Sequence, residues 1–184
     1  GINVFRAHSV TVSGNHVADC AFSAIRANGG SNLQVTANQC LRSGECALYA
    51  EFEFTGAVIS SNLVDGGARG ISIVNYMQGG RLAVCSGNLV RNIGLTAPYE
   101  DKDHQFGTGI SVEADTTVTG NVIEDAERVG LALGWGPYLR DVVATGNVIR
   151  GSGTGILVSV VEGAGSTVIS DNIISGATKG AIVG

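Results

Sequence analysis

The side chains best suited to chemistry lie in one stretch, LTAPYEDKDHQF, which runs from Leu95 to Phe106 and is called the insert below. Six consecutive residues of the insert are ionisable: Tyr99, Glu100, Asp101, Lys102, Asp103 and His104. Only histidine among these residue types titrates near neutral pH, so we predict that His104 carries the proton in any reaction here. The alternative is a histidine on an exposed loop that takes no part in chemistry.

Two glutamates occupy equivalent positions in the sequence. Glu51 lies three residues after Leu48 and Glu113 three residues after Ile110, and each of these aliphatic residues follows a small residue. If both lie on strands two coils apart in a stacked β-structure, their backbones are ~9.6 Å apart, at ~4.8 Å per coil. Inverting glycosidases hold their acid and base carboxyls ~6.5–9.5 Å apart. We therefore predict that one glutamate is the base, with the other glutamate or His104 as the acid. The alternative is a pair of solvated surface glutamates.

Other polar and aromatic side chains, on the insert and on the segments predicted to neighbour it, are typical of a sugar-binding site. The predicted substrate-binding residues are Arg26, Tyr49, Ser72, Asp101, Asp103, Asp115, Trp135 and Tyr138. Aromatic rings can stack on sugar rings, although Trp135 and Tyr138 are equally expected to cover the side of the structure.

Acidic side chains also raise the question of a metal ion. Ca²⁺ takes oxygen ligands, and four carboxylates could supply them: Asp101, Asp103, Glu113 and Asp115. A bound Ca²⁺ would offset the repulsion between paired acids and an acidic sugar. The sequence has no fixed calcium-loop spacing and no paired cysteine spacing, so we assign no metal site and no cofactor.

A seven-residue motif organises the chain, and VTGNVIE from Val118 is its clearest copy. Its asparagine occurs seven times: Asn15, Asn38, Asn62, Asn88, Asn121, Asn147 and Asn172. A second signal, a small residue followed by an aliphatic one, runs between the copies: Ile2, Ile25, Leu48, Ile71, Ile110, Leu131, Ile156 and Ile182. The intervals between these aliphatic residues are 23 residues three times, then 39, 21, 25 and 26. A period in the twenties is typical of a solenoid.

Within each repeat, β-branched residues alternate with polar ones, which predicts strands rather than helices. We therefore predict an all-β fold: a single-stranded, right-handed parallel β-helix of about seven coils of 21–26 residues, with one longer coil that holds the insert at about 95–106. Residues 1–184 then form one segment. Asparagine tolerates left-handed backbone, so we place each repeated Asn in a tight corner and stack these residues in a ladder along one edge.

Composition limits the partners of this segment. A net charge of −5 and a pI near 5.1, with no basic cluster, argue against nucleic acid, and no run of 18 apolar residues could span a membrane. Cys20, Cys40 and Cys85 occupy repeat positions of small apolar residues, so we expect them in the core. Both ends stop on the repeat signal without a cap, so we expect a piece of a longer chain whose open strand edges favour end-to-end association.

Loops of unequal length flank one of the predicted sheets. The insert precedes it, and three shorter expansions follow it: NYMQGG after Ile73, GWGPYLRD after Leu133 and VEGAGS after Val160. Such loops along a rigid solenoid build a groove.

The repeats cover nearly the whole chain and resemble those of right-handed parallel β-helices of the pectate-lyase-like superfamily. They are most similar to the repeats of twin-arginine-translocated bacterial β-helix proteins whose activity is not established. The resemblance implies export to the periplasm or outside the cell, and a carbohydrate ligand. The polygalacturonase motifs Asn-Thr-Asp, Asp-Asp and Gly-His-Gly are absent. Tyr99 and His104 are spaced similarly to residues of alginate epimerases, but the aspartates differ, so no catalytic role is carried over.

We therefore predict an exported β-helix protein that binds or cleaves a polysaccharide or oligosaccharide in a groove along one sheet. Hydrolase, lyase and epimerase activity all stay open. The alternative is a structural or interaction solenoid, such as an adhesin-like surface module, without catalytic activity.

Overall fold

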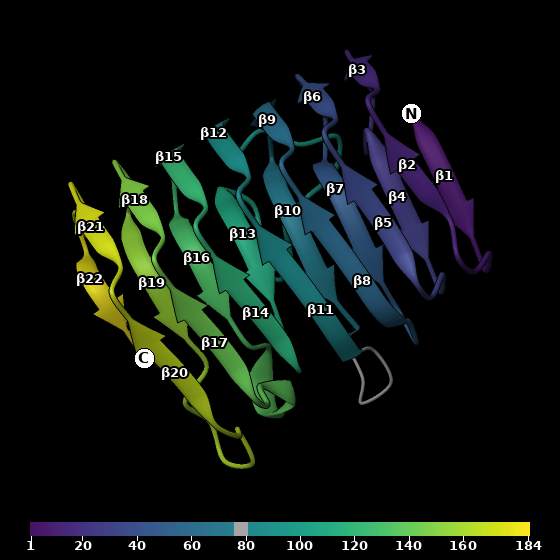
Figure 1. Cartoon of the computed structure of the whole chain (residues 1–184). Helices are drawn as coiled ribbons and strands as arrows, with labels where there is room; N and C mark the ends of the chain where they lie inside the picture. The colour runs from purple at the N-terminus through teal and green to yellow at the C-terminus, as the bar shows by residue number, and fades with distance from the viewer. Residues whose placement is uncertain (76–80) are drawn as a thin grey trace.

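The computed structural model describes residues 1–75 and 81–184, and these residues form three parallel sheets (Figure 1). Each coil contributes one strand to each sheet, which confirms the predicted all-β parallel β-helix of about seven coils. In Figure 1 the coils follow one another in chain order, so the two termini lie at opposite ends of the stack.

The strands divide evenly among the sheets. Sheet A contains β1 (Ile2–Phe5), β4 (Ile25–Asn28), β7 (Cys46–Glu51), β10 (Arg69–Val74), β13 (Thr108–Val112), β16 (Val129–Leu133), β19 (Thr154–Val158) and β22 (Gly180–Val183). Sheet B contains β2 (Thr11–Ser13), β5 (Leu33–Thr36), β8 (Thr55–Ser60), β11 (Arg81–Ser86), β14 (Thr116–Thr119), β17 (Val142–Thr145) and β20 (Thr167–Ser170). Sheet C contains β3 (His16–Ala18), β6 (Gln39–Leu41), β9 (Leu63–Gly67), β12 (Leu89–Ile93), β15 (Val122–Ala126), β18 (Val148–Arg150) and β21 (Ile173–Ser175). The only helical element in the described ranges is the 3-10 helix η1 (Gly136–Tyr138).

The eight aliphatic signal residues pair with one another across sheet A, from Ile2 opposite Ile25 to Ile156 opposite Ile182. Six of these side chains are buried between the three sheets, where Val, Ile, Leu and Ala fill a narrow core. At the two ends of the stack, Ile2 is partly buried and Ile182 is 54% exposed. The predicted core positions of the cysteines are confirmed: Cys40 and Cys85 are buried in the core, and Cys20 packs against it. Burial raises the pKa of the Cys40 and Cys85 thiols to about 12, so both are protonated at neutral pH.

The predicted Asn ladder is present and unbroken. From Asn15 to Asn147, each Asn donates from its backbone N–H and its side-chain Nδ2 to Oδ1 of the next Asn, at 2.9–3.0 Å. From Asn38 onward, Nδ2 also donates to a backbone carbonyl of the previous coil, such as that of Cys85 for Asn121. The ladder thus satisfies polar groups that the tight corner would otherwise bury without partners.

We predicted left-handed backbone at the repeated Asn, and this prediction is wrong. The left-handed residue is the one directly before each Asn. These residues are Gly14, Ala37, Ser61, Gly87, Gly120, Gly146 and Asp171, with φ between 55° and 68°. The Asn itself stays in ordinary backbone because its amide must point along the stack to reach the next coil. Glycine suits the position before it, since it adopts positive φ without a steric cost.

We expect Ala37→Gly to stabilise the protein by ~0.5–1 kcal/mol, because left-handed backbone costs a residue with a Cβ ~1–2 kcal/mol and the greater freedom of unfolded glycine returns only part of that. Ala37 is exposed at φ 55°, so little packing is lost. The matched reverse change is Gly120→Ala at φ 63°, where an added Cβ meets no atom within 4 Å; it should destabilise by a similar amount. Urea denaturation measures the unfolding free energy of both variants. If both are as stable as the parent, the positive φ of these residues does not affect stability and the argument fails.

Candidate functional site

The insert connects β12 to β13 and packs on the outer face of sheet A. The Tyr99 hydroxyl donates to Oε1 of Glu45, just before β7, and the Tyr99 ring meets Phe106 edge-on with centroids 5.4 Å apart. With the insert in place, every residue of β7, β10 and β13 is buried, although half of their side chains point away from the core.

Asp101 fixes the turn of the insert rather than facing a ligand. Its carboxylate accepts the N–H groups of Gln105 and Phe106 at 2.7 and 2.8 Å, and Arg128 Nη1 lies 3.3 Å away. Burial raises the pKa of Asp101, but these hydrogen bonds and the Arg128 charge outweigh it and hold the pKa below its usual range. Asp103, two residues on, is exposed.

Glu51, the first predicted catalytic carboxylate, is buried and forms an ion pair with the partly exposed Arg26. Glu51 is 2% exposed, and its Oε1 accepts from Arg26 Nε at 2.5 Å and from Asn28 Nδ2 at 3.2 Å. The predicted position is correct: Glu51 pairs with Val74 on β10, and the register of β10 with β13 places Glu113 on the other side of Val74.

Tyr49 lies between two guanidinium groups instead of offering an open ring. Arg26 and Arg69 place their guanidinium carbons 5.1 and 5.6 Å from the Tyr49 ring centroid, within cation–π range. Arg69 Nη1 also donates to the Tyr49 hydroxyl at 2.8 Å, and that hydroxyl lies 3.4 Å from Oε1 of Glu45. Together with Glu51, these residues form a cluster of charged groups around Tyr49, in which Arg26 is partly exposed and the others are buried.

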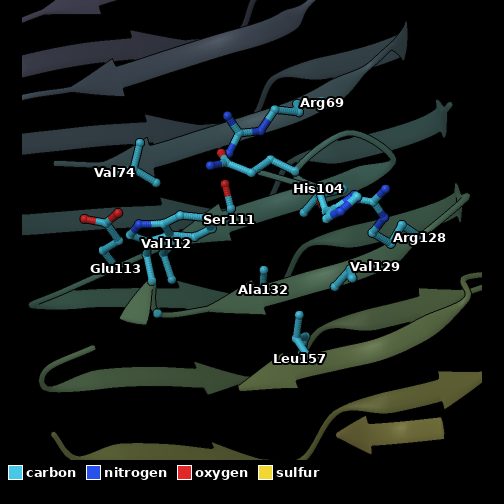
Figure 2. Close-up of a pocket in the computed structure, with 14 residues that line it drawn as sticks. Arg69, Val74, His104, Ser111, Val112, Glu113, Arg128, Val129, Ala132 and Leu157 are labelled. Atoms are coloured by element: carbon cyan, nitrogen blue, oxygen red, sulfur yellow. The ribbon is translucent and has the colours of Figure 1, made fainter. Parts of the chain in front are cut away.

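Two hollows lie between the insert and sheet A, and they share Arg69 and Gln105. The Glu113 hollow (Figure 2) is lined by Arg69, Val74, His104, Gln105, Thr108, Ser111, Val112, Glu113, Arg128, Val129, Ala132, Gly134, Trp135 and Leu157. The Tyr49 hollow is lined by Tyr49, Arg69, Tyr99, Glu100, Asp101, Lys102, Asp103, Gln105 and Phe106.

Two of the three predicted catalytic residues line the Glu113 hollow. Glu113 is 1% exposed, and its Oε2 accepts the backbone N–H of Asn75 at 2.8 Å. His104 is exposed and has left-handed backbone at φ 54°. Figure 2 shows Glu113 at one end of the hollow and His104, beside Arg128, at the other. A carboxylate, an imidazole and two guanidinium groups therefore line one hollow, whereas Glu51 lines neither hollow.

Of the two aromatic residues in the loop after β16, only Trp135 lines a hollow. Trp135 lines the Glu113 hollow and is 38% exposed. Tyr138 lies at the end of η1, half-buried, and lines neither hollow. Ser72 is also outside both hollows, because it is fully buried beneath the outer surface and accepts a hydrogen bond from Ser111 Oγ at 3.0 Å.

Asp115 faces another part of the surface than predicted. Strand β13 ends at Val112, so the in–out alternation does not extend to Asp115, which has φ 49°. Its carboxylate makes a two-pronged ion pair with Arg140 at 2.8 Å, beside sheet B, and the hydrogen bonds from Arg140 lower its pKa. Since Asp101 is turned toward the insert backbone, the four carboxylates considered for Ca²⁺ are not gathered in one place. Within residues 1–75 and 81–184, no group of three or more His, Cys, Asp or Glu side chains could hold a metal ion.

Three charged residues of this site were not predicted from the sequence: Glu45, Arg69 and Arg128. Counting outward positions forward from each aliphatic signal residue misses Arg69, because Gly70 interrupts the alternation. A Cβ on Gly70 would lie 2.5 Å from the core side chain of Val90, so Gly70 faces inward and Arg69 extends over the outer face. An arginine directly before the small residue of the repeat signal was the available clue.

The predicted loops on the far side of sheet A are present where the structure describes them. The segment with η1 follows β16, and another loop follows β19 at the same edge of the stack (Figure 1). Of the predicted loop NYMQGG, only Asn75 lies within the described residues. Among the helices of the described ranges, none is long and apolar enough to cross a membrane.

Comparison of the chain with protein-family models, with curated proteins and with solved structures gives no match. The parallel β-helix and its Asn ladder are therefore established by the structure alone.

Proposed function

We propose that the chain binds an oligosaccharide on the outer face of sheet A, in the Glu113 hollow beside the insert. The observation that carries this proposal is that Trp135, which is 38% exposed, lines the same hollow as buried and exposed polar groups. Ala132 and Leu157 lie on neighbouring strands next to the Trp135 loop and add apolar surface. Sugar rings present apolar faces and a rim of hydroxyls, and a site of this kind matches both.

The charged side chains of the hollow and His104 would contact the ligand in this proposal. Glu113 accepts hydroxyl hydrogen bonds, and Arg128 and Arg69 donate them. If the ligand is also transformed, Glu113 acts as the base and His104 as the acid, because they face one hollow from opposite ends (Figure 2). The rigid β scaffold supports the role of Glu113, since it holds this residue in a fixed register, whereas His104 is carried by the insert.

Membership of the pectate-lyase-like superfamily and export from the cell belong to the same proposal. They are supported by the repeat and by the parallel β-helix, and they agree with a carbohydrate ligand. A structural or interaction solenoid without a ligand is the competing account.

We expect a neutral or uronate oligosaccharide to bind and to raise the melting temperature of the parent protein. Glu113→Gln and His104→Asn should each weaken the affinity for this ligand by about tenfold or more, the effect of a lost charge-assisted hydrogen bond. The screen combines a glycan array with thermal shift, followed by calorimetry of any ligand found. The matched control is Glu124→Gln, a half-buried glutamate on the outer face of sheet C and away from both hollows, which should bind like the parent. A ligand that all three variants bind like the parent would place the site elsewhere.

A further inference from the structure

The insert meets sheet A through polar and aromatic contacts near its two ends. Tyr99 reaches Glu45 through one hydrogen bond, and Asp101 meets Arg128 at 3.3 Å. Phe106 is buried at the end that enters β13. Between these points, Lys102, Asp103 and His104 are exposed. A segment whose middle is exposed opens at a lower free energy than the buried coils beneath it.

The closed insert also divides the space above sheet A. The Glu113 hollow encloses about 90 Å³ and the Tyr49 hollow about 410 Å³, whereas small-molecule sites typically measure ~300–1,000 Å³. The Glu113 hollow alone is therefore small for a ligand of several sugar units. Because Arg69 and Gln105 line both hollows, displacement of the insert would join them into one site.

We propose that the insert is a latch over the ligand site, closed by the hydrogen bond from Tyr99 to Glu45 and opened when a ligand hydroxyl takes the place of the Tyr99 hydroxyl. This inference rests on the proposed ligand site and adds its regulation. Opening exposes Glu45 as a second carboxylate acceptor, beside Arg69. The exchange replaces one hydroxyl donor by another, so Glu45 keeps a partner in both states. The ligand then shifts the equilibrium by its greater affinity for the open state.

The test measures opening without any ligand, through the reactivity of a buried thiol. Ser111 is 8% exposed and lines the Glu113 hollow together with His104 and Gln105, so Ser111→Cys places a maleimide-reactive thiol there. Cys85 is fully buried in the core and reports global unfolding in the same molecule. Peptide mass spectrometry separates the labelling rates of the two sites.

In the Ser111→Cys background, Tyr99→Phe should raise the labelling rate at position 111 by about tenfold, the effect of one lost hydrogen bond to a charged group, and leave the rate at Cys85 unchanged. Glu45→Gln keeps an acceptor and should give a smaller increase. Tyr138→Phe is the matched control, because Tyr138 lines neither hollow, and it should change neither rate.

Two results would overturn the latch. One is a Tyr99→Phe rate at position 111 equal to that of the parent. The other is an equal acceleration at position 111 and at Cys85, which would mean that Tyr99 supports the whole fold and not a local closure. A protein in which Tyr99→Phe accelerates labelling at position 111 but which binds no oligosaccharide would refute the ligand proposal and the opening by a ligand hydroxyl, and would leave only the closure by Tyr99 and Glu45 standing.

Discussion

Replacing Ile123 by aspartate is expected to unfold the chain. Ile123 lies in the middle of β15, is fully buried, and pairs with Val90 and Ile149 in the neighbouring coils. A carboxyl group there must either ionise in apolar surroundings or stay protonated with a pKa raised by ~3–5 units, at 1.36 kcal/mol per unit. At pH 7, about three units above the ordinary pKa of aspartate, keeping the carboxyl protonated costs ~4 kcal/mol. That cost adds to the lost apolar burial, and the sum approaches the ~5–15 kcal/mol that holds a typical domain together. Val64→Asp, two coils earlier at the same register, should behave alike.

The adjacent residue, Val122, provides a control because its side chain points outward from the same strand. Val122 is 39% exposed on the outer face of β15, so Val122→Asp should cost about 1 kcal/mol or less. Circular dichroism and thermal denaturation of the two variants measure the contrast. Equal stabilities of Ile123→Asp and Val122→Asp would contradict the inward and outward assignment of the sheet C strands.

The second large effect is expected from Asn121→Ala in the middle of the ladder. The Asn121 Oδ1 accepts from the backbone N–H and the Nδ2 of Asn88, and its own Nδ2 donates to the carbonyl of Cys85 and to Oδ1 of Asn147. All of these groups lie in a buried corner. Since each buried polar group that loses its partner costs ~1–3 kcal/mol, the variant should lose several kcal/mol of unfolding free energy.

Asn15→Ala provides the matched comparison at the first rung. Asn15 donates to Asn38 and to the carbonyl of Ser13, and it is only half-buried, so its removal should cost about 1 kcal/mol. Urea denaturation with both variants measures the difference. Equal losses at Asn15 and Asn121 would show that the ladder does not act through buried hydrogen bonds.

The fold could be predicted from the sequence because every coil repeats the same constraints. An aliphatic residue such as Ile110 must face the core in register with its counterparts, and one misplaced coil would turn its apolar side chains outward. The corner was harder to predict, since both Asn and the small residue before it tolerate positive φ. The choice between them depends on the direction of the Asn amide along the stack, which spacing alone does not reveal.

The site was predicted less completely because it depends on a segment that does not repeat. Spacing placed Glu113 and the insert on one sheet. The path of the insert, however, follows from single contacts such as Tyr99 with Glu45 and Asp101 with its own backbone. Periodicity has no signal for these contacts. It also gave no sign that Glu51 would be buried in an ion pair, since that depends on what covers the sheet.

The central claim is that an oligosaccharide binds in the hollow lined by Trp135, and Trp135 is the only tryptophan of the chain. Titration of the parent protein with the oligosaccharides of the screen, followed by tryptophan emission, therefore reports directly on this hollow. We predict a saturable change in emission whose midpoint moves to about tenfold or higher ligand concentration in Glu113→Gln. Binding detected by calorimetry without any change in Trp135 emission, or no binding of any oligosaccharide, would contradict the account.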